Sequence, residues 1–332
     1  MSGLLETKSL TIGYSQSAGT KILQQDLSLS IAKGETISLM GQNGVGKSTF
    51  IKTISGLIPA LGGEVFIQNQ KISALSKNEM ARSMSVVLTE KPYAQNLTVL
   101  ELIAIGRHPY SGWMGTLNQK DLEVIEWAIN ETHINYLANH KIFELSDGQL
   151  QKVMIARALA QETDLIILDE PAAHLDLYNK IEVMMLLRKI ADQGKGVLIS
   201  THDLQVSTQL SDKLWLFNFN EEVKIGTPED LILDGSLEKT LYLEGYGYDM
   251  MYGTVENSRK PKGNISVAGP DKEKFWTIQA LKRNGFLVKN KADVQIDIRN
   301  EKWYILQKSG ENVCNSISEL LDLLKISYQN LK

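Results

Sequence analysis

A glycine-rich segment carries the clearest chemistry in the sequence. Residues 41–49 read GQNGVGKST, which fits the phosphate-binding pattern GxxxxGK[ST]. The apolar run at residues 35–40 predicts a strand before it, and residues 48–54 predict a helix that begins at the loop. A strand that leads into a helix through glycines directs backbone N–H groups, and the positive end of the helix dipole, at one point. The segment therefore predicts a site for a polyphosphate.

The residues of this loop have separate expected tasks at a bound nucleotide. Lys47 would reach the terminal phosphates, and the Ser48 hydroxyl would hold Mg²⁺. The other expected nucleotide contacts are Gly41, Asn43, Gly44, Gly46 and Thr49. A glycine turn with an accidental lysine is the alternative interpretation, and the strand and helix on either side weaken it.

Two adjacent carboxylates follow an apolar strand later in the chain. Residues 165–170 read LIILDE, which predicts a buried strand that ends at the sheet edge beside the phosphate loop. Asp169 would bind Mg²⁺ through its water shell, and Glu170 would orient and polarise an attacking water. Solvated acids after a buried strand are common, but together with the loop this pair predicts nucleotide hydrolysis.

A third segment narrows the type of nucleotide hydrolase. Residues 143–150, FELSDGQL, precede a helix predicted at residues 151–160, and Ser146 is well placed to cap it. In isolation this would be a routine helix cap. Its LSDGQ stretch is similar to the LSGGQ signature of ATP-binding cassette (ABC) ATPases, and it stands one short helix ahead of the strand with the two carboxylates. The resemblance to that family extends over roughly residues 4–242.

The resemblance implies an α/β fold, namely a P-loop NTPase ABC cassette with a RecA-like mixed sheet, an antiparallel β subdomain and a helical subdomain. In that family two cassettes pair head to tail. Each ATP would then lie between residues 41–49 of one chain and Ser146, Gly148 and Gln149 of the other. Two helix N-termini would face one γ-phosphate, and hydrolysis would remove the bridge. The implied cofactors are ATP and Mg²⁺, and the chain would act as a homodimer.

Three further positions match the same family. Tyr14 falls where an aromatic ring stacks on the adenine, although a strand tyrosine more often packs against its neighbours. His174, Leu175 and Asp176 resemble the loop that couples the two ATP sites of a dimer, and Asp176 is also a plausible helix cap. His202 resembles the switch histidine that contacts the γ-phosphate, with a structural role as the alternative.

The sequence departs from the family pattern at two positions. Asp147 stands where glycine is usual, and because Gly148 is retained we expect the carboxylate to point away from the phosphates. The family also has a glutamine after the strand predicted here at residues 84–88, whereas Thr89 and Glu90 follow in this chain. We expect Thr89 to take that position and to ligate Mg²⁺ through its hydroxyl or through water, with Glu90 as the alternative.

Residues 98–113 resemble a narrower group within the family. They read TVLELIAIGRHPYSGW, and importers of iron–siderophore, haem and cobalamin have a GRxPY-like stretch in their helical subdomain. The resemblance implies that two copies dock beneath two integral-membrane permease subunits, and that a substrate-binding protein delivers the chelate from outside. An exporter ATPase, or a soluble ABC ATPase acting on DNA, ribosomes or cluster assembly, is the alternative.

The rest of the chain supplies the elements that would position these residues. Alternating polar and apolar residues predict antiparallel strands at residues 9–14 and 27–31, ahead of the phosphate loop. An all-helical insertion is expected over about residues 89–161. Further strands are predicted at residues 64–67, 164–168, 196–200, 213–217 and 222–225, and helices at residues 176–191, 203–210 and from residue 228.

The composition changes near residue 245, which predicts a division into parts. We expect a cassette over residues 1–245, a linker over residues 246–263, and a small α+β domain over residues 264–332. The last part has helices predicted at residues 271–284 and 317–324 and strands at residues 286–288, 293–298 and 303–306. It would be a regulatory or dimer-stabilising module, or an accessory packing element.

Composition limits the cellular location and the kinds of partner that we expect for this chain. The 332 residues are 43% hydrophobic and 22% charged, which is ordinary for a globular protein, and we find no apolar run that would span a bilayer and no signal at Met1. We therefore expect a cytoplasmic protein, peripheral on the inner face of the membrane through its partners. The net charge of −4 argues against a broad nucleic-acid surface. The single cysteine, Cys314, excludes an internal disulfide.

Overall fold

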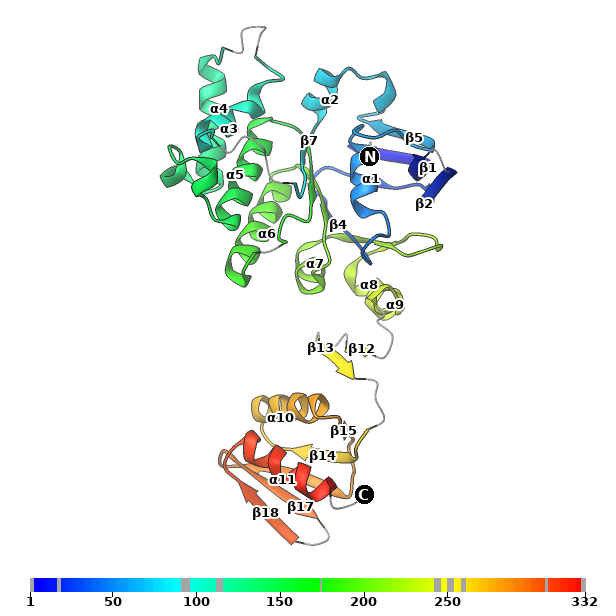
Figure 1. The fold of residues 1–332 in the computed structure, drawn as a ribbon, viewed down its shortest axis with the longest axis vertical. Helices are drawn as coiled ribbons and strands as arrows, with labels where there is room; N and C mark the ends of the chain where they lie inside the picture. Colours follow the sequence, from blue (N-terminus) through cyan, green and yellow to red (C-terminus); the bar gives the residue numbers. More distant parts are fainter. Residues whose placement is uncertain are drawn as a thin grey trace. The chain divides into compact units, whose positions relative to one another are not determined.

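Two units make up the chain, Met1–Thr240 and Leu241–Lys332, and each is described by itself (Figure 1). The computed structural model describes residues 3–16, 19–90, 96–111, 116–173, 175–241, 246–249, 254–257, 261–307 and 310–329. Trp113 and His174, which the family resemblance singled out, lie outside the described residues. Among the helices that are described, none combines the length and the apolar content needed to cross a bilayer.

A six-stranded sheet forms the core of the first unit, in the order β11-β10-β4-β9-β8-β7. Its strands are β4 (Thr36–Gly41), β7 (Met84–Val87), β8 (Leu165–Asp169), β9 (Gly196–Ser200), β10 (Lys213–Phe217) and β11 (Lys224–Gly226). Neighbouring strands are parallel except for the β10–β11 pair at one edge. Every residue of β8 and β9 is buried, as expected for strands covered on both faces.

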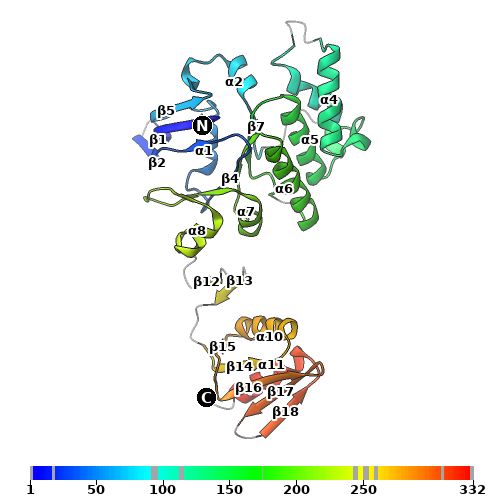
Figure 2. The same ribbon diagram turned by 180° about the vertical axis from the view of Figure 1, so that it is seen from behind.

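Helices cover both faces of this sheet. They are α1 (Lys47–Ile54), α5 (Asp147–Ala160), α6 (Leu177–Asp192) and α7 (Leu204–Leu210), followed in the chain by α8 (Pro228–Leu233) and α9 (Ser236–Leu241). Alternate residues of β8 face opposite layers, so that Ile166 packs with α5 and α6 whereas Ile167 packs with α1. Figure 2 shows α5 and α6 to one side of the sheet and α1 to the other.

A second, antiparallel sheet packs over α1. It contains β1 (Leu5–Gln16), β2 (Gly19–Leu27), β3 (Ser30–Ile31), β5 (Gly62–Ile67) and β6 (Gln70–Lys71). The single strand predicted at residues 27–31 is wrong, because β2 ends at Leu27 and β3 begins at Ser30. The chain turns at Asp26, where φ is 56°. The Thr7 side chain then spans the break, donating to the Leu27 carbonyl and accepting from the Leu29 N–H.

The insertion predicted over residues 89–161 has helices and turns but no strand in its described part, which also contains an isolated bridge between Thr98 and Lys141. It contains α3 (Val99–Ala104), α4 (Gln119–Glu131), α5 and three 3₁₀ turns. Thr98, Asn118 and Ser146 each cap a helix with a reciprocal capping box. The predicted start of α5 at residue 151 is too late, because the Ser146 cap places Asp147 at its first position.

Side chains of α5 cover the outer edge of β7, which is the last strand of the large sheet. Arg157 Nη2 donates to the Val86 carbonyl over 3.2 Å, and Gln161 Nε2, just after α5, donates to the Met84 carbonyl over 2.9 Å. The helix α2 (Lys77–Ser83), which leads into β7, was not predicted. Its signal is the capping box formed by Ser76 and Glu79.

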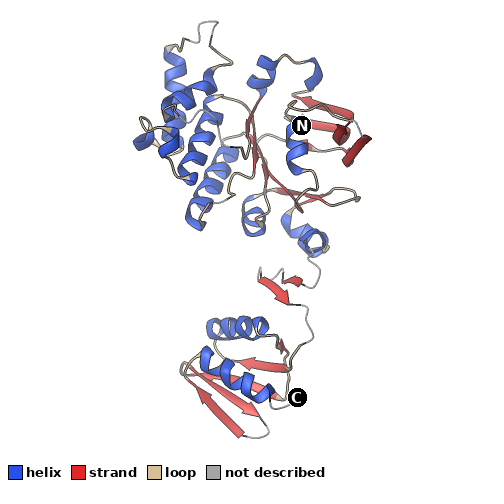
Figure 3. Cartoon of the chain, in the orientation of Figure 1, coloured by secondary structure: helices blue, strands red, loops and turns tan. Residues whose placement is uncertain are grey.

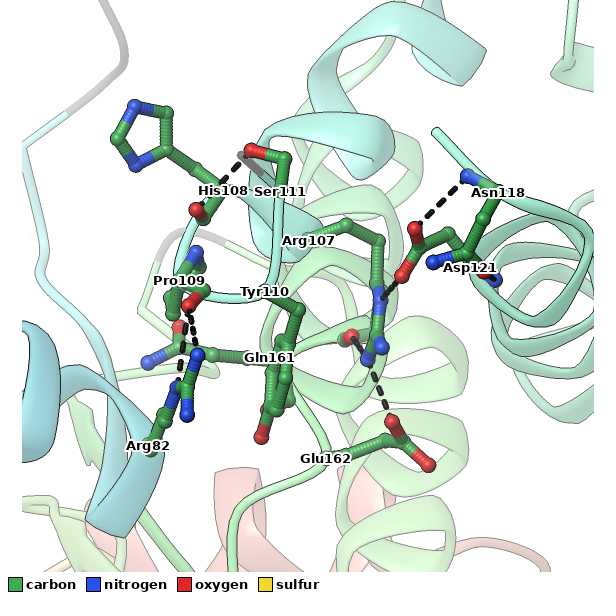
Figure 4. Close-up of polar contacts among 11 residues, drawn as sticks. Arg82, Arg107, His108, Pro109, Tyr110, Ser111, Asn118, Asp121, Gln161 and Glu162 are labelled. Carbon is green, nitrogen blue, oxygen red and sulfur yellow. Dashed lines mark hydrogen bonds and ion pairs between the residues drawn. The ribbon is translucent and has the colours of Figure 1, made fainter. Parts of the chain in front are cut away.

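Arg107 ties the helical insertion together (Figure 4). This side chain is 2% exposed, and its Nε donates to Asp121 Oδ1 over 2.9 Å. Its Nη1 donates to the Ala160 carbonyl over 2.8 Å and to Glu162 Oε2 over 2.6 Å. The guanidinium also lies 4.2 Å from the centre of the Tyr110 ring. The GRHPY stretch therefore joins the end of α3 to α4 and to the end of α5.

Arg82 extends this network to the helix before β7. It donates to the Pro109 carbonyl over 2.8 Å, and its guanidinium lies 5.0 Å from the Tyr110 ring centre. Tyr110 Oη donates to the Gln161 carbonyl over 3.0 Å. Tyr110 therefore contacts two guanidinium groups, which attract the face of an aromatic ring, and the insertion is fastened to the segment that leads into β7.

The second unit has its own sheet and core (Figure 3). Its strands are β14 (Asn264–Ala268), β15 (Leu287–Val288), β16 (Val294–Arg299), β17 (Lys302–Gln307) and β18 (Gly310–Cys314), in the order β15-β14-β16-β17-β18. Its helices are α10 (Asp271–Arg283) and α11 (Ile317–Gln329). A buried apolar cluster that includes Ile265, Leu281 and Leu320 joins the sheet to both helices.

Three strands in this part of the chain were not predicted. Residues 246–263 were predicted as a linker, but β12 (Tyr246–Asp249) and β13 (Thr254–Asn257) form an antiparallel hairpin there. The glycines of this stretch suggested a loop, although its Tyr, Thr and Val residues favour strands. β18 was missed because Gly310, Glu311 and Asn312 are poor strand formers, and its pairing with β17 decides the structure.

The buried Arg107–Asp121 pair generates a stability prediction. Asp121→Asn should lower the free energy of unfolding of the first unit by about 3 kcal/mol, because removing one partner leaves a buried charge poorly compensated. Calorimetric unfolding would measure this change. Glu64→Gln is the matched control, since the Lys71–Glu64 pair is about half exposed and should contribute below about 1 kcal/mol. Equal effects of the two substitutions would contradict the prediction.

Candidate functional site

The predicted phosphate loop joins β4 to α1. Gly46 precedes α1 with φ of 114°, a conformation that favours glycine. A side chain at Gly41 would clash with β10, because its Cβ would lie 2.4 Å from the Phe217 carbonyl oxygen. Lys47 Nζ lies over the loop and donates to the Gly41 carbonyl over 2.8 Å and to the Gln42 carbonyl over 3.3 Å. Backbone N–H groups and a cation are thus gathered at the start of α1.

The two predicted acids lie close to this lysine. Burial lowers the pKa of Lys47, and the negative charges of Glu170 and Asp169 oppose that shift. Asp169 is the last residue of β8 and is buried, whereas Glu170 turns away from the strand with φ of 49°. The carboxyl ends of β4 and β8 therefore bring Lys47, Asp169 and Glu170 to one edge of the sheet.

Ser200 organises both acids and was not predicted. It is the last residue of β9, directly beside Asp169 in the register. Its hydroxyl donates to Asp169 Oδ1 and accepts from the Glu170 N–H, which also donates to the Ser200 carbonyl over 3.1 Å. The sequence signal for Ser200 was a polar residue at the end of the apolar strand predicted at residues 196–200.

His202 contacts Glu170 directly. Its Nδ1 lies 3.1 Å from Glu170 Oε2, and its side chain is 66% exposed against 23% for Glu170. The next residue, Asp203, caps α7 and forms a 2.6 Å ion pair with Lys180 on α6. The imidazole therefore lies on the solvent-exposed side of Glu170. The segment that carries it is anchored to α6 by the Asp203–Lys180 ion pair.

Thr89 and Glu90, the two candidates for the position of the family's glutamine after β7, make different contacts in the structure. Thr89 Oγ1 donates to the Asp169 carbonyl over 3.0 Å. Glu90 instead forms an exposed ion pair with Lys52 of α1, with a separation of 3.4 Å. Thr89 is therefore the residue that contacts the acid strand, and its hydroxyl keeps lone pairs for a further contact.

The oxygen groups at this edge suit Mg²⁺. Asp169 Oδ1 accepts from Ser200, and within the described residues Oδ2 has no hydrogen-bond partner. Mg²⁺ binds through one or two carboxylates together with hydroxyls, waters and phosphates, rather than in a cage of protein ligands. Among the described residues, no group of three or more His, Cys, Asp or Glu could hold a metal ion. Ser48 is the second residue of α1 and is exposed, so its hydroxyl and the Asp169 carboxylate are oxygen donors of the kind that Mg²⁺ prefers.

Tyr14 lies next to the phosphate loop on β1. Its hydroxyl shares a 2.6 Å hydrogen bond with Thr49 Oγ1 of α1, and the residue is 43% exposed. Because the hydroxyl is held by α1 while part of the side chain remains accessible, the residue offers a surface against which a base can stack. Thr49 itself is buried and is engaged by Tyr14.

The LSDGQ residues begin α5. Ser146 Oγ accepts from the Gln149 N–H over 3.3 Å, and Gln149 Oε1 accepts from the Ser146 N–H over 2.9 Å. Gly148 packs against α6, since a Cβ there would lie 2.8 Å from the Asn179 side chain. Within the described residues, the structure joins none of Ser146, Gly148 and Gln149 to the phosphate loop of the same chain by a hydrogen bond.

Asp176 caps α6, which is the alternative role considered for it. Its Oδ1 accepts from the Asn179 N–H over 2.8 Å, and its Oδ2 accepts from the Asn179 side chain over 2.9 Å. These hydrogen bonds, that from the backbone first, lower the pKa of Asp176. Asn179 therefore contacts both Gly148 and Asp176, so that the start of α5 and the loop before α6 share one partner.

Comparisons with known proteins identify the family. The ABC transporter family profile matches residues 24–173, and that of the iron ABC transporter C-terminal domain matches residues 262–325. The iron(3+)-hydroxamate import ATP-binding protein FhuC of Bacillus subtilis is 35% identical over 241 residues, which are 72% of this chain and 88% of that protein. The petrobactin import ATP-binding protein FpuD of Bacillus anthracis is 32% identical over 256 residues, 76% of this chain and 92% of that protein.

A solved structure agrees with these relatives. The ATP-binding cassette MJ0796, a dimer in a post-hydrolysis state bound to ADP and Pi, is 28% identical, with a TM-score of 0.60 over 68% of this chain and 98% of that chain. The predicted α/β cassette fold is confirmed. The chain therefore belongs to the family of ABC transporter ATP-binding proteins, the ABC ATPases.

Proposed function

We propose that this chain is the ATP-hydrolysing subunit of an ABC importer that energises the uptake of an iron–siderophore chelate across the cytoplasmic membrane. The observation that carries the proposal is the meeting of Lys47, Asp169 and Glu170 at one edge of the parallel sheet. The choice of cargo is supported by two relatives named for iron-hydroxamate and petrobactin import, and by the iron transporter profile that matches the second unit.

The phosphate loop binds the nucleotide. Lys47 Nζ leaves the loop carbonyls to bind the terminal phosphates, and the loop N–H groups, including those of Gly44, Gly46 and Thr49, hold the phosphate oxygens. Gly41 and Asn43 shape the loop, and Tyr14 stacks on the base.

Ser48, Asp169 and Thr89 are the residues that would hold Mg²⁺, Asp169 and Thr89 directly or through water. A bound Mg²⁺ neutralises charge on the phosphate oxygens.

Glu170 orients the attacking water and accepts its proton. The water oxygen bonds to the γ-phosphorus while the bond from that phosphorus to the bridging oxygen breaks, which gives ADP and phosphate. His202 holds Glu170 Oε2 on one side and contacts the γ-phosphate on the other. The Glu170 N–H donates to the Ser200 hydroxyl, which fixes the backbone position from which the carboxylate extends.

A second copy of the chain completes the site. Ser146, Gly148 and Gln149 of that copy contact the γ-phosphate through the start of α5, where the helix dipole is positive. Asp176 lies in the segment that couples the two sites. The pair docks beneath integral-membrane permease subunits, to which a substrate-binding protein delivers the chelate, and is therefore peripheral on the inner face of the membrane. We assign the cassette to residues 1–245 and an accessory domain to residues 264–332.

The hydrolysis mechanism predicts a trapped dimer. Glu170→Gln should lower kcat by at least about 100-fold while ATP still binds, so that ATP holds two copies together as a dimer in size-exclusion chromatography. Lys47→Ala is the paired variant, and it should lose both ATP binding and the ATP-dependent dimer. A Glu170→Gln protein that stays monomeric with ATP would contradict the closing mechanism, and an unimpaired Lys47→Ala protein would contradict the proposed nucleotide site.

The placement of Thr89 predicts a separation of turnover from binding. Thr89→Ala should lower kcat about tenfold, equivalent to about 1.4 kcal/mol in the barrier, while the affinity for ATP stays within about twofold. Thr89→Ser keeps the hydroxyl and should retain most of the activity. The comparison uses steady-state ATP hydrolysis over a range of Mg²⁺ concentrations. Unchanged hydrolysis by Thr89→Ala would remove this residue from the metal site.

The cargo assignment requires the whole transporter. Vesicles that contain this chain with its permease subunits should take up radiolabelled iron–siderophore in an ATP-dependent way, and Glu170→Gln should abolish that uptake. Haem and cobalamin serve as competing cargo in the same vesicles. Uptake of either one in place of the siderophore would overturn the cargo assignment, and outward movement would favour an exporter. Full ATP hydrolysis by a dimer that binds no membrane subunit would favour a soluble ABC ATPase.

A further inference from the structure

A small cleft lies beside Glu170. Leu88, Thr89, Asp147, Gln151, Met154 and Glu170 are among its lining residues. Its volume is about 70 Å³, and a water needs roughly 10–15 Å³ measured in this way. The cleft therefore has room for a few water molecules between the end of β8 and the start of α5.

The amide of Gln151 is a buried group without a partner. Its Nε2 atom is buried, and no hydrogen-bond acceptor for it is found among the described residues. Its polar neighbours on α5 are engaged, since Gln149 belongs to the capping box and Lys152 pairs with Glu182 over 2.6 Å. Buried donors in folded proteins are nearly always paired, and an exception requires an explanation.

Glu170 offers the complementary acceptor in the same cleft. Its N–H is held by Ser200, and its Oε2 lies against His202. For Oε1 the described residues provide no hydrogen bond. The hydroxyl of Thr89, which also lines the cleft, donates its proton to the Asp169 carbonyl. Gln151, whose amide nitrogen is unpaired, and Glu170 are thus lining residues of the same small cleft.

We propose that Gln151 is a positioning residue for hydrolysis, whose side-chain amide donates to the Glu170 carboxylate, directly or through a water in the cleft. The Gln151 amide and His202 bind different oxygens of the Glu170 carboxylate and together fix its orientation. This inference rests on the proposed function, because it assigns the hydrolytic role to Glu170. Burial of Gln151 for packing alone is the competing explanation.

The two explanations predict different results for Gln151→Met, which keeps the length of the side chain and removes its polar atoms. If Gln151 positions Glu170, kcat for ATP should fall about tenfold. The KM for ATP should stay within about twofold, because the described structure shows no hydrogen bond between Gln151 and residues 41–49. The melting temperature should stay level or rise, since the substitution removes an unpaired buried amide.

A double-mutant cycle in the full-length protein tests whether Gln151 acts through Glu170. In a Glu170→Gln background, Gln151→Met should leave the residual single-turnover rate within about twofold, because groups that act as a unit are strongly non-additive. Gln279→Met is the matched control, since Gln279 of α10 also has a buried, unpartnered Nε2. It should leave kcat unchanged.

Each outcome has a separate meaning. A wild-type kcat in Gln151→Met, a raised KM, or a further tenfold loss in the Glu170→Gln background would overturn the positioning role and leave the proposed function intact. An absence of ATP hydrolysis in both the wild-type protein and Gln279→Met would overturn the proposed function and this inference together.

Discussion

The hydrogen bonds made by Ser200 are the constraint on which the site depends. One hydroxyl, at the end of β9, donates to the Asp169 carboxylate and accepts from the Glu170 N–H. It therefore links two residues that must do different work within a few ångströms of each other. Asp169 remains buried at the strand end, whereas Glu170 leaves the strand with a positive φ. The parallel pairing of β8 with β9 thus sets where Asp169 ends the strand and where Glu170 leaves it.

The surrounding structure holds this edge from two sides. Thr89, which follows β7, donates to the Asp169 carbonyl, and Lys180 of α6 pairs with Asp203, the residue after His202. Further away, the contacts of Arg107 and Tyr110 fasten the helical insertion to the segment before β7 (Figure 4). The strand β7, which precedes Thr89, is therefore attached to the insertion at one end and, through Thr89, to the Asp169 edge of the sheet at the other.

The local sequence pattern was enough to predict those parts of the site whose residues are close together in one segment. The phosphate loop, the paired acids and the Ser146 cap each depend on residues that are close in sequence, so that spacing alone identifies them. Ser200 could not be found in this way, because its importance comes from a neighbouring strand that is distant in the chain. The choice between Thr89 and Glu90 likewise depends on which side chain faces β8 and which faces Lys52.

The errors in the fold have the same origin. β18 has poor strand propensity and forms because β17 pairs with it, and the hairpin of β12 and β13 lies in a stretch whose glycines suggested a loop. The break between β2 and β3 depends on a side chain from β1. In each case a contact with another segment outweighs the local preference, and a single sequence does not display that contact.

The polar cover on β7 has a consequence for the behaviour of the protein in concentrated solution. An uncovered terminal strand offers its carbonyls to any extended peptide and invites association between sheets. Here the Arg157 guanidinium and the Gln161 amide already occupy the carbonyls of Val86 and Met84. Two copies are therefore hindered from joining through continuous β-pairing at this edge of the large sheet.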